Sequence, residues 1–169
     1  MEDQENLEAE DFIPHEEKEV KDEDVDIYEL LFNELTSIMQ DRDSSSVEVT
    51  AWMIGDKLRR VLGVVSDRKK GKEAFELLQK QISKRFGVEF TLEKLHECIK
   101  IADEFPDLFL FSEMTDHLSM DHIRALINVN SDLARTYYSE MCKAEYWSAK
   151  ELEEKISLKA FEKEYGEEG

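Results

Sequence analysis

Residues 72–104 read KEAFELLQKQISKRFGVEFTLEKLHECIKIADE, and they contain two apolar patterns of helical period separated by a short break. The first pattern stops at Gly87, which suits the position after a helix because glycine adopts left-handed backbone cheaply. The second follows Thr91, a good N-cap residue, and stops before Pro106, which cannot continue a helix. The sequence therefore predicts one helix over residues 72–86 and another over residues 92–104.

The same periodicity continues on both sides of this pair. Five further helices are predicted, over residues 26–40, 47–62, 119–129, 131–144 and 148–165, the last three with N-cap residues Ser119, Ser131 and Ser148. Residues 63–71 are expected to form an exposed basic turn, and residues 107–118 an apolar connection. Only 2 Pro and 6 Gly occur in 169 residues. We expect an all-α fold, a compact bundle of about seven helices that contains a helix-turn-helix-like pair.

The ends of the chain differ in composition from this helical part. Residues 1–24 carry 12 acidic and 2 basic side chains and few apolar ones, which predicts a disordered acidic tail before a helical domain at residues 25–165. Residues 166–169 are expected to fray. Cys98 and Cys142 have no CxxC spacing and occupy apolar helical positions, which is typical of reduced, buried thiols in a cytoplasmic protein. We expect no membrane association, because no apolar run approaches the roughly 18 residues of a membrane span.

The net charge of −19 hides one basic segment. Residues 56–85 hold 10 Lys or Arg against 4 Asp or Glu, a charge of +6. Together with two lysines of the helix that follows, they supply the candidate nucleic-acid-binding residues: Arg59, Arg60, Arg68, Lys69, Lys70, Lys72, Lys80, Lys84, Arg85, Lys94 and Lys100. In a helix-turn-helix the first helix crosses the phosphate backbone and the second enters the major groove. Here the second helix would also present Glu93, Glu97, Asp103 and Glu104, which oppose docking on phosphates.

Enzyme patterns give no catalytic site. Asp107 with Glu153 and Lys155 formally matches a PD…ExK nuclease pattern, but a loop and an exposed helix face replace the adjoining strands that such sites need, and charged residues are common here. His117 and His122 are five residues apart, which fits neither a helical pair nor a zinc pattern, so a capping or core-edge role is expected. We expect no enzyme activity, no cofactor and no metal.

A series of short stretches occurs in the order typical of a known family. They are Trp52-Met53-Ile54-Gly55, Leu77–Gly87, Thr91–Leu95, Phe105-Pro106, Leu118-Ser119 with His122, Tyr137-Tyr138, Trp147-Ser148 with Glu151-Leu152 and Ile156, and Phe161-Glu162. On these residues the chain, from about residue 26 to 161, resembles the amino-terminal domain of YhcG-type proteins, in which a PD-(D/E)XK nuclease-like domain follows.

The resemblance implies a helix-turn-helix-bearing module that binds DNA or directs the nuclease. Three features depart from the family pattern: Met120 stands where tryptophan is usual, the helix over residues 92–104 is acidic, and the sequence holds no nuclease half. We therefore expect a single targeting domain, either excised or stand-alone.

Two functions remain open from the sequence. The first is a non-catalytic DNA-binding or targeting module that uses residues 56–85. The second is a protein-interaction or regulatory module whose acidic surface engages a basic partner such as a nuclease, with the acidic tail either mimicking nucleic acid or masking the basic face. Basic side chains gathered on one surface without carboxylates would favour the first function, and acidic side chains from residues 86–169 interleaved with them would favour the second.

Overall fold

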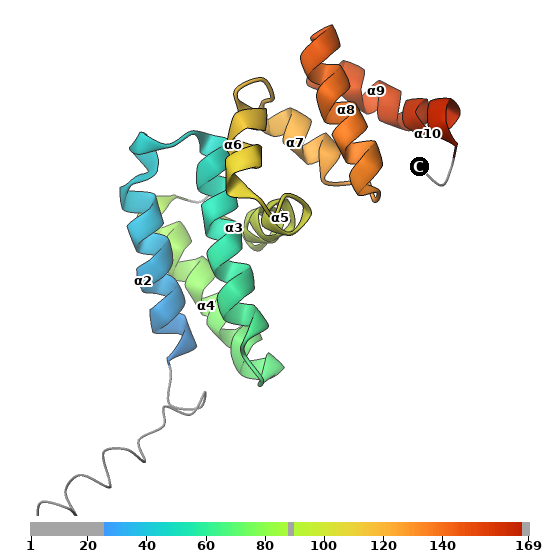
Figure 1. The fold of residues 1–169 in the computed structure, drawn as a ribbon. Coiled ribbons are helices and arrows are strands. Elements are labelled where there is room, and N and C mark those ends of the chain that lie inside the picture. The colour runs from blue at the N-terminus through green and yellow to red at the C-terminus, as the bar shows by residue number, and fades with distance from the viewer. Residues whose placement is uncertain (1–25, 88–89, 167–169) are drawn as a thin grey trace, which may run out of the picture.

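The computed structural model describes residues 26–87 and 90–166, and the regular elements of this part of the chain are all helices, which confirms the all-α prediction (Figure 1). The elements are α2 (Ile27–Gln40), the 3-10 helix η2 (Arg42–Ser44), α3 (Val47–Gly63), α4 (Arg68–Phe86), α5 (Leu92–Glu104), α6 (Leu108–Thr115), α7 (Met120–Leu126), α8 (Asp132–Glu145), α9 (Ala149–Ser157) and α10 (Ala160–Tyr165). The predicted acidic tail, residues 1–24, lies outside the described residues. No helix among those described is both long enough and apolar enough to cross a membrane.

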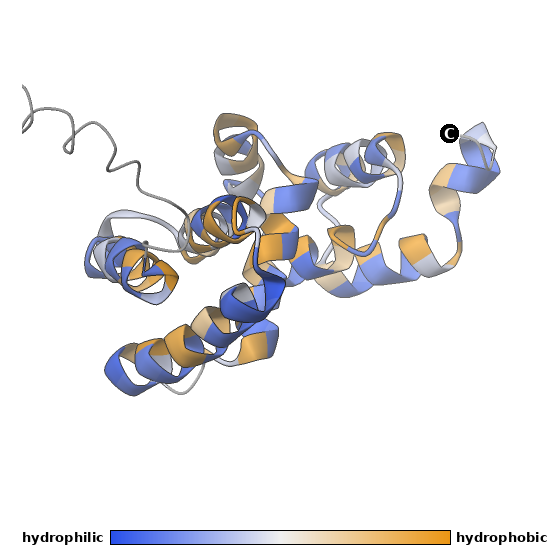
Figure 2. Cartoon of the chain, turned by 90° about the horizontal axis from the view of Figure 1, so that it is seen from below, coloured by the Kyte–Doolittle hydropathy of each residue, from blue (hydrophilic) through white to orange (hydrophobic). Residues whose placement is uncertain are grey.

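The helices form two neighbouring groups (Figure 1). α2, α3 and α4 lie side by side, with α5 crossing α3 and α6 packing on α3, while α7, α8, α9 and α10 pack on one another. Polar and apolar residues alternate along the helices (Figure 2), and one apolar core runs through both groups, from Leu31 in α2 to Phe161 in α10. The fold thus depends on amphipathic helices that share a continuous core.

The tightest contact in the first group is the crossing of α3 and α5. A Cβ on Gly55 of α3 would lie less than 3.0 Å from the carbonyl group of Cys98 in α5, so only glycine permits this approach. Close by, Trp52 Nε1 donates a hydrogen bond to the carbonyl oxygen of Phe105 at 2.6 Å. Trp52 and Gly55, two of the residues that carried the family resemblance, therefore hold α5 against α3.

Most predicted helix starts are confirmed by their caps. The side chains of Thr91, Ser119, Ser131 and Ser148 each accept a hydrogen bond from the backbone N–H three residues later. His122 completes a capping box, because its Nδ1 accepts from the backbone N–H of Ser119 at 3.2 Å. The predicted capping role of His122 is therefore confirmed.

Three predicted boundaries were wrong. α6 forms inside the segment predicted as a connection, where Asp107 caps it by accepting from Leu110 N–H at 3.1 Å. α4 begins at Arg68, four residues early, because the Asp67 side chain accepts from two backbone N–H groups and starts the helix within the predicted turn. The predicted closing helix divides into α9 and α10 at Lys159, whose φ of 54° is left-handed.

Candidate nucleic-acid interface

α4 carries most of the predicted basic residues, and it carries them unpaired. Its exposed bases are Arg68, Lys69, Lys70, Lys72, Lys80, Lys84 and Arg85, and none of the ion pairs within the described residues involves any of them. Glu73 and Glu76 are the acidic residues of this helix. α4 therefore has a surplus of positive charge that is available to an outside anion.

The N-terminal turn of α4 is unusual electrostatically. Arg68, Lys69 and Lys70 fill it, although the positive end of the helix dipole disfavours cations at that position by about 0.3–1 kcal/mol each. Only the Asp67 cap supplies a compensating charge there. A hollow of about 450 Å³ beside this turn is lined by Arg68, Lys72 and His96, among others. This end of α4 therefore joins the positive end of the helix dipole to three basic side chains.

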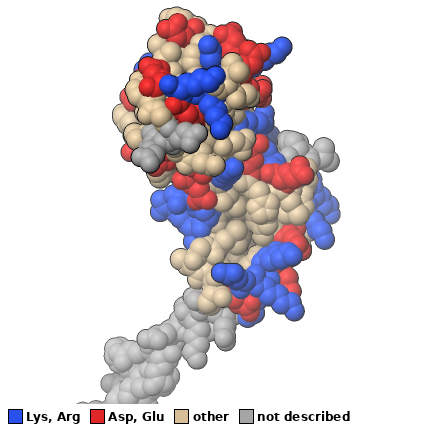
Figure 3. Space-filling model, turned by 90° about the vertical axis from the view of Figure 1, so that its right-hand side faces the viewer, with Lys and Arg blue, Asp and Glu red and all other residues tan. Residues whose placement is uncertain are grey.

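The bases of α4 do not form one continuous patch. At about 1.5 Å per residue, Lys69 and Lys84 lie roughly 22 Å apart along the helix, and the exposed carboxylates of Glu73 and Glu76 lie between them. Figure 3 shows basic and acidic side chains interleaved over the visible surface. None of the described carboxylates from residue 90 onward, however, forms an ion pair with these seven bases.

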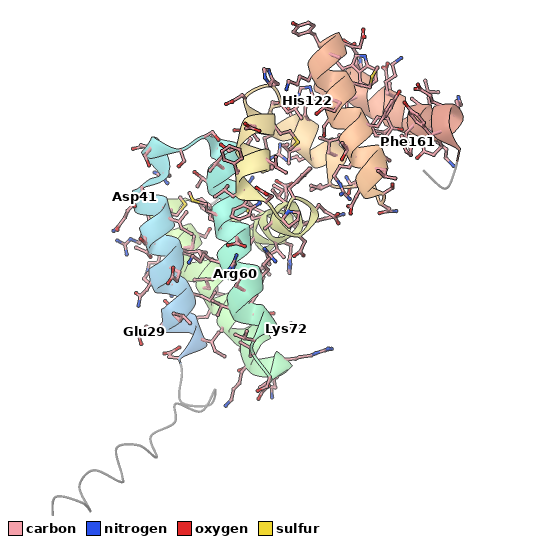
Figure 4. The ribbon with its side chains drawn as sticks, in the orientation of Figure 1. Glu29, Asp41, Arg60, Lys72, His122 and Phe161 are labelled. Carbon is pink, nitrogen blue, oxygen red and sulfur yellow. The ribbon has the colours of Figure 1, made fainter. Side chains whose placement is uncertain are left out.

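Arg59 and Arg60, also candidates, are bound within the chain. Both pair with the carboxylate of Asp56, at 2.9 Å each, and Asp56 is only 8% exposed. Figure 4 shows Arg60 on α3, within the first helix group. The spacing of three and four residues from Asp56 could have indicated these pairs in the sequence. Phosphate contact by either arginine would compete with a buried carboxylate.

The far end of α4 joins cations to aromatic rings. The guanidinium of Arg85 lies 5.9 Å from the ring centre of Phe32 and 5.2 Å from that of Phe86, and Arg42 lies 5.9 Å from the Phe86 ring. Tyr28 adds a further ring, 5.7 Å from Phe32. The sequence analysis did not single out Arg42, because it lies between the helices predicted over residues 26–40 and 47–62. A cation–π contact holds each arginine in place while leaving its N–H donors free to bind an anion.

α5, the second helix of the predicted helix-turn-helix, is poorly equipped to read DNA. Lys94 pairs with Glu97 at 3.3 Å, and Glu97 also binds Arg124 of α7 at 3.2 Å. Lys100 donates to the side-chain oxygen of Asn128 at 3.2 Å. The exposed side of α5 therefore presents carboxylates, and its two lysines already have partners within the chain. The Gln79 side chain of α4 donates a hydrogen bond to the carbonyl oxygen of Phe90, just before α5, at 2.8 Å. This bond links the two helices.

The residues considered for catalysis do not converge. Asp107 is the cap of α6, whereas Glu153 and Glu154 are exposed on α9. His122 binds the carbonyl oxygen of Trp147 through Nε2 at 2.8 Å in addition to its capping contact, and Figure 4 places it in the second helix group. Within residues 26–87 and 90–166, no group of three His, Cys, Asp or Glu side chains is arranged to hold a metal ion.

The two cysteines lie in the interior as predicted. Cys98 is 1% exposed and Cys142 is 4% exposed, and both are free thiols. Burial raises the pKa of each to about 11. A cysteine acts as a nucleophile or a metal ligand in its thiolate form, and a raised pKa disfavours that form. Neither thiol is therefore activated for either role.

The described part of the chain is thus an all-helical domain with one unpaired basic helix. Residues 26–163 match the family model of the DUF1016 N-terminal domain, and the chain belongs to this family. The family is the N-terminal part of YhcG-like proteins, which confirms the resemblance found in the sequence. No curated protein and no solved structure matches the sequence significantly.

Proposed function

We propose that this protein is a non-catalytic, cytoplasmic DNA-binding or targeting module that contacts DNA through the phosphate backbone. The observation that carries the proposal is the set of seven exposed bases of α4, none of them in an ion pair within the described residues. Arg68, Lys69 and Lys70 lie at the positive end of the helix dipole, which is electrostatically unfavourable, and contact with an anion would offset that unfavourable energy.

The proposed contact relies on charge and position rather than on base reading. α4 would lie against the backbone, with Lys69 and Lys70 at one end and Lys84 and Arg85 at the other. α5 would not enter the major groove as the second helix of a helix-turn-helix does, because Glu93 and Asp103 are exposed on it and would be repelled by phosphates. We therefore expect little sequence preference.

Salt-dependent duplex binding tests the proposal. Fluorescence anisotropy with a labelled random duplex, at ~50 mM and ~200 mM salt, should show an affinity loss of about 3.5-fold per phosphate contact. Lys80→Glu with Lys84→Glu should weaken binding at least about tenfold, because two contacts become repulsive. The matched control is Lys150→Glu with Lys163→Glu, which changes the net charge equally but alters exposed lysines of α9 and α10. Absence of binding at the lower salt, or equal losses in both double variants, would refute the proposal.

The second candidate is a protein-interaction or regulatory module that engages a basic partner such as a nuclease. A specific observation favours it as well: carboxylates gather around an apolar groove between α6 and α8, away from α4. The two functions use different residues, so one molecule can perform both.

A further inference from the structure

A groove of about 420 Å³ lies where the two helix groups meet, between α6 and α8. Its walls belong to different groups, because α6 packs on α3 whereas α8 packs on α7, α9 and α10. On α8 the lining residues run from Asp132 to Lys143, which corresponds to about 16 Å, or three helical turns. The groove is therefore long enough for a short helix.

The floor of the groove is apolar. Its lining includes Phe105, Leu110, Phe111, Met114 and Leu118. Leu110 is 61% exposed although it lines the groove, and its neighbour Phe109 is 71% exposed. Large apolar side chains that stay exposed beside an apolar groove are typical of a surface that a partner covers.

The rim of the groove is acidic. Asp107, Glu113 and Glu140 are exposed around it, and none of them belongs to an ion pair within the described residues. Lys143 is the exposed basic residue among the lining side chains. The charge of the rim therefore complements a basic ligand.

Arg135 fixes the base of the groove. Its side chain is 5% exposed and binds Glu104 at 2.6 Å and Asp132 at 2.7 Å, which ties the end of α5 to the start of α8. Its guanidinium also donates to the Val129 carbonyl oxygen at 2.7 Å. Arg135 is thus held in place from within the chain, and it supports the groove rather than offering a free charge to a ligand.

We propose that the α6–α8 groove docks an amphipathic helix of a partner protein, with a large apolar side chain on the floor and Lys or Arg residues one turn away that pair with Asp107, Glu113 and Glu140. Helices commonly bind in grooves in this way. The proposal rests on the second candidate function and names its site and the chemistry of its ligand. Residues 1–24 of the chain itself are an unsuitable occupant, because 12 acidic residues against 2 basic ones would be repelled by the rim.

The test begins with selection of binders from a displayed library of random three-turn helical peptides, using the full-length protein. Selected peptides should combine one or two large apolar residues with flanking Lys or Arg. Labelled copies are then titrated by anisotropy. Leu110→Asp should weaken them at least about tenfold, because a carboxylate would face the buried anchor. Leu158→Asp is the matched control, since Leu158, the C-cap residue of α9, is 60% exposed and does not line the groove.

The rim is tested by charge reversal. Glu113→Lys with Glu140→Lys should weaken the selected peptides several-fold and flatten their salt dependence. The control pair Glu153→Lys with Glu154→Lys changes the net charge equally at exposed positions of α9 and should have little effect. Lys80→Glu with Lys84→Glu should leave peptide affinity unchanged, which separates this site from the proposed DNA contact.

Each other outcome overturns the proposal. Peptides that bind the Leu110→Asp variant equally well would refute the groove while leaving a protein-interaction function in place. Failure to select any basic amphipathic peptide would refute both. A second copy of the chain is the remaining occupant, because α4 is basic and its Leu77 is 44% exposed. Sedimentation velocity would reveal that case as self-association that Leu110→Asp abolishes.

Discussion

Replacing Gly55 by alanine provides the sharpest test of the fold, because two effects of opposite sign act on one position. Alanine is the better helix former by about 1 kcal/mol, so an unobstructed site would gain stability. At Gly55 the new methyl group would lie less than 3.0 Å from Cys98 O, Cys98 C and Ile99 N, all backbone atoms of α5. A side chain could rotate away, but backbone atoms can be avoided only if α3 and α5 separate.

The size of the effect follows from that separation. Ordinary van der Waals contact begins at 3.4 Å, and the new methyl group would lie well inside that distance from the Cys98 carbonyl oxygen. α3 and α5 must therefore move apart by more than about 0.5 Å, the gap at which dispersion energy is already lost. A radial gap of about 0.5–1 Å forfeits a quarter to a half of the dispersion energy of the atoms concerned. Trp52 and its hydrogen bond to Phe105 share this interface. Overpacking and lost contacts together should exceed the helix-propensity gain, and we expect a net loss of about 3 kcal/mol.

Urea and thermal unfolding of the full-length protein, followed by circular dichroism, measure the change. A loss of about 3 kcal/mol should lower Tm by roughly 10 °C. Gly63→Ala is the matched control in the same helix. Apart from the neighbouring residues and the backbone of α3 itself, no atom of the described residues lies within 4 Å of its added methyl group, so it should be neutral or stabilise by up to about 1 kcal/mol. If Gly55→Ala proves as stable as the wild type, the close crossing of α3 and α5 is incorrect.

Two further predictions concern buried polar groups. Arg135→Ala should lower the free energy of unfolding in urea by about 3 kcal/mol, and Arg135→Met clearly less, because methionine keeps much of the packing of this 5% exposed side chain. Equal losses in the two variants would mean that packing contributes nothing. Burial raises the thiol pKa of Cys98 to about 11, above its value in the unfolded chain, so this contribution to stability is complete below about pH 9 and is lost as the pH rises toward 11. The free energy of unfolding, measured from pH 8 to 11, should therefore fall more steeply for the wild type than for Cys98→Ala. A thiol reagent at pH 8 should modify the native protein far more slowly than the urea-unfolded one. Equal slopes or equal rates would contradict a buried thiol.

The sequence by itself determined the helical class, most helix starts and the basic character of α4. These features are local: a cap such as Thr91 or Ser119 acts on N–H groups three residues away, and apolar spacing marks a buried face without reference to the partner helix. The family could also be recognised from the sequence, because its markers include residues such as Trp52 and Gly55 with strict packing roles.

Only the tertiary structure decided the rest. α6 has eight residues, too few to be stable alone, and it forms because Phe111 is 1% exposed in the core beneath it. The break before α10 has no local signal: Lys159 takes a left-handed conformation while the Tyr138 hydroxyl of α8 accepts the Phe161 N–H at 3.2 Å and Phe161 itself is buried. The α6–α8 groove depends on both helix groups, so no stretch of sequence contains it. Propensity and capping act over a few neighbouring residues, whereas burial and pairing between distant helices depend on how those helices meet.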